Sequence, residues 1–100
     1  MKHFVRIHYN VPELGGELLN IAELEEVSAH ECTMVRMIEL DPSETITGIY
    51  VDGRVIGQAN KPMGTVPHPR TYDAMEGITA THLTEAEFEG LWSEAQAKLQ

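Results

Sequence analysis

The sequence predicts an α+β fold: a mostly antiparallel sheet of four or five strands with a C-terminal amphipathic helix packed on one face. Two observations support this class. The last stretch, Leu83 to Gln100, repeats apolar residues at three- and four-residue steps, which is typical of a helix with one buried face. The stretches before it alternate or run apolar, as strands do, and the helix needs such an apolar sheet to cover.

The chain of 100 residues is expected to form one domain, residues 1–100, with a core that removes roughly two-thirds of its unfolded surface from water. Apolar residues make up 42% of the sequence, which argues against disorder. The alternating, charged N-terminal stretch does not resemble a signal peptide, and a single cysteine, Cys32, permits no internal disulfide. We therefore expect a cytoplasmic protein.

Residues 2–10 alternate in polarity, which predicts a half-buried first strand. The inward face is expected to carry Val5, Ile7 and Tyr9, and the outward face Phe4, Arg6 and His8. Pro12 and the Gly15-Gly16 pair predict a loop. The next stretch, residues 17–26, fits either a short helix or a second strand.

Residues 30–40 are apolar on both faces, which predicts a central strand. Asp52-Gly53 between two β-branched runs predicts a tight hairpin, because both residues tolerate positive φ. Residues 60–70 contain three prolines and a glycine and are expected to form an irregular crossover. A helical turn is possible at residues 71–75, and residues 78–82 are expected to lead directly into the final helix.

The final helix carries strong start signals. Thr84 is a suitable N-cap, and Glu87 stands at the third helical position, as a capping box requires. Leu83 and Phe88 have the spacing of a hydrophobic staple. The buried face is expected to contain Phe88, Leu91, Trp92, Ala95 and Leu99.

Catalytic and metal-binding signals are weak. His30 and Cys32 would share a face of one strand, and His8 could join them in a zinc site, but structural zinc sites normally show closely spaced ligand pairs. We expect no metal, no cofactor and no enzymatic activity, since the usual nucleotide-binding, hydrolase and metalloprotease motifs are missing from the sequence. Glu23 and Glu39 lie within apolar strands and are interpreted as structural partners of Arg6 or Arg36.

The net charge is −9, from sixteen acidic and seven basic residues. No Lys or Arg lies between Arg6 and Arg36, or between Arg70 and Lys98, although each stretch holds six acids. Such a chain repels nucleic acid and attracts basic partners, whose association its field accelerates. The alternative is that the acidity only keeps the protein soluble.

The order of several features resembles a small uncharacterised bacterial domain family of about this length. These features are His8 before Pro12-Glu13, the Ala22–Glu25 segment, Val35–Glu39, the Asp52-Gly53 turn, Pro67-x-Pro69, and Phe88 followed by Trp92 and Ala95. The resemblance favours a strand at residues 17–26. By size and charge the chain also resembles immunity proteins, which neutralise polymorphic bacterial toxins; this second likeness is one of class alone.

The leading hypothesis is an immunity protein that blocks the active site or substrate groove of a cognate toxin, a nuclease or another basic toxin. No nucleic-acid or membrane partner is expected. The predicted contact residues are Glu13, Glu17, Glu25, Glu26, Glu31, Asp73 and Glu76, with Tyr50, Met63 and Tyr72 as apolar alternatives. The alternative function is a small-molecule-binding or enzymatic domain using the sheet face near His8, His30 and Cys32.

Overall fold

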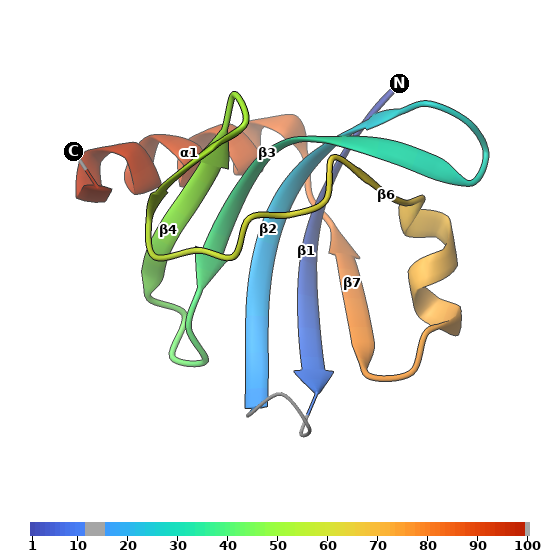
Figure 1. Ribbon diagram of the computed structural model, residues 1–100, viewed down its shortest axis with the longest axis horizontal. Coiled ribbons are helices and arrows are strands. Elements are labelled where there is room, and N and C mark those ends of the chain that lie inside the picture. The colour runs from blue at the N-terminus through green and yellow to red at the C-terminus, as the bar shows by residue number, and fades with distance from the viewer. Residues whose placement is uncertain (12–15, 100) are drawn as a thin grey trace.

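The computed structural model describes residues 1–11 and 16–99, and it consists of one antiparallel sheet with a single C-terminal α-helix (Figure 1). The strands are β1 (Lys2–Val11), β2 (Gly16–Glu26), β3 (Glu31–Leu40), β4 (Ile46–Val51), β5 (Arg54–Gly57), β6 (Thr65–Pro67) and β7 (Ile78–His82). The 3₁₀ helix η2 (Pro69–Ala74) precedes β7, and α1 (Glu85–Leu99) ends the described chain. The α+β class is confirmed, and residues 17–26 form a strand.

The sheet has the order β5-β4-β3-β2-β1-β7, with β6 paired to β3, so it contains seven strands rather than the four or five predicted. The two additional strands are short. Thr65 to Pro67 pairs with the first residues of β3, at a position where a proline costs no ladder bond because it lies at an edge. Ile78 to His82 pairs with β1 and does not simply lead into the helix.

The predicted hairpin at Asp52-Gly53 is confirmed. It joins β4 to β5, and its two turn residues have φ values of 53° and 75°. Positive φ at both positions matches the right-handed twist of the flanking strands. The predicted capping box of α1 is also confirmed: Glu87 N donates to Thr84 Oγ1 (3.1 Å), and Thr84 N donates to the Glu87 carboxylate (2.8 Å).

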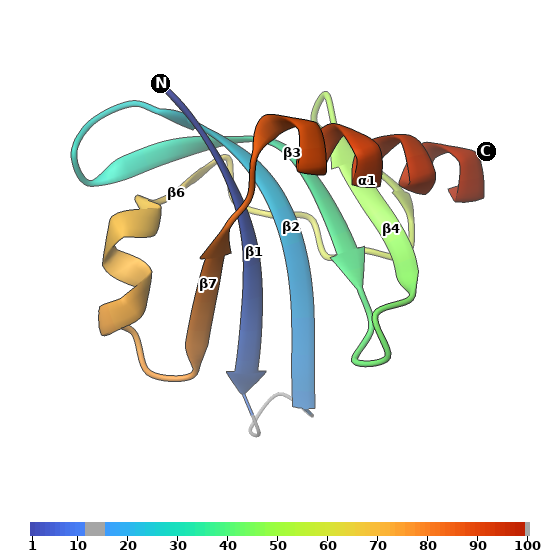
Figure 2. The same cartoon turned by 180° about the vertical axis from the view of Figure 1, so that it is seen from behind.

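Both faces of the sheet are buried, by different segments. Helix α1 lies across one face (Figure 2) and contributes Phe88, Trp92 and Ala95 to the core there. Residues 58–64, which we call the strap, cross the opposite face with β6 and η2 (Figure 1). Val5 and Ile7 are buried on the strap face, as predicted inward. The outward assignment of Phe4 was wrong, because Phe4 packs under α1 against Phe88.

Arg36 joins the sheet to the helix. Its Nε donates to Glu23 on β2 (2.5 Å), and its two terminal nitrogens donate to Glu89 on α1 (3.1 and 2.7 Å). The guanidinium carbon lies 4.8 Å from the centre of the Phe88 ring and 5.0 Å from that of Trp92. A planar cation can satisfy carboxylates in its plane and aromatic rings above it at the same time.

Glu23 is 2% exposed and therefore depends on these partners. Burial alone would raise the pKa of Glu23, but hydrogen bonds from Arg36 and Lys2 outweigh burial and lower it. The predicted structural role of Glu23 is confirmed. Glu39 does not pair with an arginine; its carboxylate accepts from Asn60 N (3.0 Å) and Asn60 Nδ2 (3.4 Å).

Replacement of Trp92 should destabilise the fold, since the side chain is only 6% exposed and stacks on Phe88. We expect Trp92→Ala to lower the free energy of unfolding by about 3–5 kcal/mol, as large-to-small aromatic changes in a core do. Gln96→Ala, on the exposed side of the same helix, is the control and should change stability little. Urea denaturation of the free protein measures both; equal stabilities would contradict the packing of α1.

Removal of Arg36 should also be costly, because it leaves Glu23 buried with Lys2 as its one remaining cation. We expect Arg36→Met to cost about 3 kcal/mol, the lower end of the range for breaking a buried pair. Adding Glu23→Gln to that variant should restore part of the loss, since it removes the unpaired charge. A double variant that is less stable than Arg36→Met alone would show that Glu23 does not require a cation.

Candidate functional site

The predicted contact residues do not form one patch. Glu13 falls outside the described residues. Glu17 lies opposite Asn10 at the start of β2, whereas Glu25 and Glu26 lie at its end, about 30 Å away at the rise of an extended strand. Glu31 follows at the start of β3, where its carbonyl oxygen accepts from Val27 N.

The remaining predicted contacts lie at the Glu17 end of the sheet or on η2. Asp73 is exposed on η2, and Glu76 is exposed next to Gly77, whose carbonyl oxygen accepts from Asn10 N (2.8 Å). Glu17 lies 3.6 Å from His8 in a shallow hollow that also contains Arg6 and Glu44, which are paired with each other. The local charge at this end is therefore mixed.

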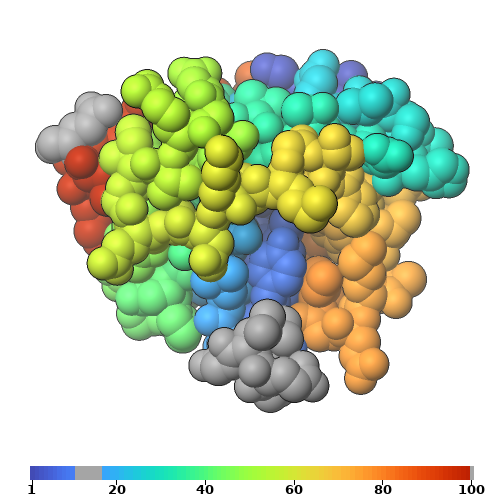
Figure 3. All heavy atoms as spheres, in the orientation of Figure 1, coloured from blue at the N-terminus to red at the C-terminus, as the bar shows by residue number. Residues whose placement is uncertain are grey.

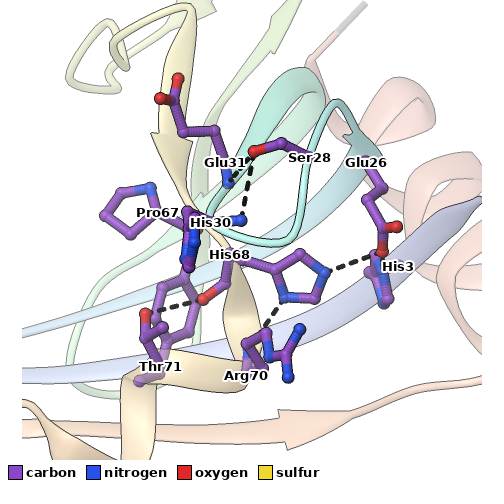
Figure 4. A network of polar contacts seen from close by, with 10 residues as sticks. His3, Glu26, Ser28, His30, Glu31, Pro67, His68, Arg70 and Thr71 are labelled. Atoms are coloured by element: carbon purple, nitrogen blue, oxygen red, sulfur yellow. Dashed lines mark hydrogen bonds and ion pairs between the residues drawn. The ribbon is translucent and has the colours of Figure 1, made fainter.

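At the other end, the β2–β3 hairpin projects beyond the rest of the sheet (Figure 1). We call this region the hairpin end; it comprises Met1 and residues 26–31. Val27 N and Ser28 N both donate to Glu31 O (3.0 and 3.2 Å), and Ser28 Oγ accepts from the backbone N–H groups of His30 and Glu31 (Figure 4). The tip is therefore fixed by its own hydrogen bonds.

The hairpin end also exposes apolar surface. Val27 is 65% exposed and Met1 is 81% exposed, and the Met1 carbonyl oxygen accepts from Glu26 N (2.8 Å). These two side chains and Met63 are the large hydrophobic residues most open to solvent in the described chain. Exposed apolar side chains surrounded by polar groups are typical of protein-interaction surfaces.

Glu26 connects the hairpin end to β1 and to the residue that precedes η2. Its Oε1 lies 3.0 Å from His3 Nε2 and 2.8 Å from His68 Nε2 (Figure 4). His68 Nδ1 accepts from Arg70 N (3.1 Å), so that nitrogen carries no proton and Nε2 is the donor to Glu26. Hydrogen bonds from His68 and His3 lower the pKa of Glu26 to about 2.

The same three residues are the one group in the described ranges with metal-ligating atoms close together, within 4.8 Å of one another. A metal would need a lone pair on His68 Nε2, but the neutral ring already uses its lone pair on Nδ1 for Arg70 N. The observed arrangement therefore suits hydrogen bonding better than metal coordination.

His8, His30 and Cys32 do not share a site. His8 lies on the helix side of the sheet near Glu17, and His30 is exposed at the hairpin tip. Cys32 is buried in the core of the strap face. Burial, together with Glu26 and Glu25, raises the pKa of the Cys32 thiol, the opposite of what a cysteine nucleophile needs.

The predicted apolar anchors differ in their exposure. Met63 on the strap is 78% exposed and free to contact a partner. Tyr50 and Tyr72 are both buried, so they are core residues. Tyr72 donates its hydroxyl to Pro67 O (2.8 Å), and burial raises the pKa of this phenol to about 12.

Sequence reasoning missed His3 and His68. One feature of the sequence pointed to His68: it lies between two prolines, which restrict the backbone and so hold the side chain in place. Its partner Glu26 could not be predicted, because it is 42 residues away in the sequence.

No family model, curated protein or solved structure matches the chain. No helix in residues 1–11 and 16–99 has the length and hydrophobicity needed to cross a membrane.

Acidification should weaken the hairpin end through Glu26. Its pKa is about 2 in the folded protein against 4.5 as the ordinary value, so the stabilisation is complete above pH 4.5 and is lost as the pH falls towards 2. We expect the difference in melting temperature between the wild type and Glu26→Gln to shrink over this interval. Thermal melts at a series of pH values test this. A difference that stays constant would mean that Glu26 has no depressed pKa, because shifts at other acids cancel in the comparison.

Proposed function

We propose that this protein is a cytoplasmic, non-enzymatic immunity protein that binds a cognate bacterial toxin domain with its hairpin end. The observation that carries the proposal is the projecting, internally bonded β2–β3 tip, which combines the exposed Val27 with the exposed carboxylate of Glu31. A surface fixed before binding loses little conformational entropy on association.

The charge distribution supports a basic partner. Three of the seven basic side chains are held in ion pairs with acids of the same chain: Lys2 with Glu23, Arg6 with Glu44, and Arg36 with Glu23 and Glu89. Glu31, Asp73 and Glu76 are exposed and have no ion pair within the described residues. The field outside the molecule is therefore negative, which accelerates encounter with a basic surface.

A toxin that cleaves nucleic acid must attract phosphates with a basic groove. Carboxylates on a narrow projecting hairpin can enter such a groove and occupy the positions that phosphates would take. Val27 then supplies apolar contact at the centre of the interface, where water is excluded. The inhibitor works by occupying the groove and requires no catalytic group.

Co-expression with the protein encoded immediately upstream tests the function. We expect its C-terminal domain to arrest growth when expressed alone and to be harmless when this chain is present. The two proteins should then purify as a complex. An upstream gene for a metabolic enzyme, or a toxic domain that this chain does not neutralise, would contradict the proposal.

Charge reversal should identify the binding surface. We expect Glu31→Lys to slow association with that toxin domain by about tenfold at low salt, because a charge at the rim acts mainly on the association rate. Glu94→Lys on the exposed side of α1 makes the same change in net charge at a distant position and is the matched control. Glu31 is preferred to Glu25 and Glu26, since Glu26 bonds His3 and His68, and Glu25 has a buried carboxylate oxygen.

Stopped-flow kinetics measure the association rates. Equal slowing by Glu31→Lys and Glu94→Lys would assign the effect to net charge alone and contradict the role of the hairpin end. No slowing by either variant would remove the electrostatic part of the proposal.

A further inference from the structure

The strap face of the sheet contains a cavity that the proposed function does not use. The strap is held above β3 and β4 by Gln58 N donating to Thr47 O (2.8 Å) and by Met34 N donating to Gly64 O (3.0 Å). Beneath it lies a cavity of about 200 Å³, and a second cavity of about 150 Å³ adjoins it. Figure 3 shows this hollow below the strap.

The walls of the larger cavity are mainly apolar. They include Tyr9, Leu18, Met34, Met37, Met63 and Val66. Met34 and Met37 on β3 form the floor of the cavity, and methionine side chains adapt to the shape of a ligand. The cavity is small against the roughly 300–1,000 Å³ of drug-sized sites, which suits a compact ligand.

Two hydrogen-bond acceptors lie side by side in this apolar cavity. Asn20 on β2 and Glu39 on β3 are direct partners in the strand register, and both line the cavity. Each residue is only 8% exposed. Asn20 Oδ1 is buried and has no hydrogen-bond partner in the described structure. Burial raises the pKa of the Tyr9 phenol in the same wall, and a hydrogen-bonding interaction with the Asn20 side chain partly offsets this rise.

Glu39 lacks a cation. Its carboxylate accepts only from the neutral amides of Asn60, and no Lys, Arg or His of the described chain lies within ion-pair distance of it. Lys61 lines the same cavity without pairing to it. A buried carboxylate without a positive partner and a buried amide oxygen without a donor are both unfavourable, and one ligand can satisfy both.

We infer that this cavity is a binding site for a small organic cation: a primary amine or amidine with a compact apolar body. The N–H donors of the cation would reach Asn20 Oδ1 and the Glu39 carboxylate together, and the body would contact the methionines and the ring of Tyr9. An anionic ligand would meet two buried acceptors in a chain of net charge −9, which outweigh the single cation of Lys61 at the cavity, so the site disfavours it. The inference is independent of the proposed toxin partner.

Three probes of similar size and different charge test the site. Phenethylamine is a cation, phenethyl alcohol is neutral, and hydrocinnamate is an anion. We expect phenethylamine to bind at least about tenfold more tightly than the alcohol, and hydrocinnamate not to bind. Titration calorimetry gives the affinities, and the methyl NMR signals of Met34 and Met37 should shift with phenethylamine if it enters the cavity.

Variants separate the site from general attraction of cations to an acidic protein. Glu39→Gln keeps the oxygen that accepts from Asn60 and should reduce the affinity for phenethylamine to that for the alcohol. Glu94→Gln removes the same charge on the exposed side of α1 and should leave the preference unchanged. Leu18→Trp fills the cavity from its wall and should abolish binding of both probes.

No binding of phenethylamine to the wild type would overturn the inference. So would unshifted Met34 and Met37 methyl signals, or equal losses in Glu39→Gln and Glu94→Gln. If Glu39→Gln does not fold, binding that persists in Leu18→Trp overturns the inference as well, because the cation then sits elsewhere.

Discussion

The guanidinium of Arg36 connects the two layers of this protein. It bonds Glu23 within the sheet and Glu89 on the helix, while its central carbon lies 4.8 Å from the centre of the Phe88 ring and 5.0 Å from that of Trp92. Only arginine offers fixed in-plane donors together with a weakly hydrated face, so lysine could not replace it here. The burial of Glu23 depends mainly on this side chain, which also adds to the packing of Phe88, Trp92 and Ala95 that holds α1 on the sheet.

The two faces of the sheet are covered in different ways. The helix face is closed by aromatic packing and ion pairs, so it contributes to stability. The strap face is closed by a proline-containing segment with few backbone bonds, so voids remain beneath it. The projecting hairpin and the cavity therefore both lie outside the part of the molecule that α1 consolidates, where polar groups can serve binding rather than folding.

Local signals were sufficient to predict α1 and the Asp52-Gly53 hairpin, since capping and turn chemistry involve residues close in sequence. The strands β6 and β7 could not be predicted in this way, because they are short and their partners are distant. Glu31 was recognisable as an exposed acid, but the pairing of Asn20 with Glu39 depends on the β2–β3 register, which a bulge between Glu23 and Leu24 shifts. The contacts of Glu26 with His3 and His68 likewise could not be predicted from the sequence, because only the folded chain brings these residues together.

The pairing of β7 with β1 has a consequence for biosynthesis. The strand nearest the N-terminus lies between β2 and a strand that begins at Ile78, and Phe4 is covered by a helix that begins at Glu85. During translation the sheet can neither complete its edge nor cover its apolar helix face until residues 78–99 have left the ribosome. Contacts of such high sequence separation form slowly, so the nascent chain exposes aggregation-prone surface for longer than a protein built from local contacts.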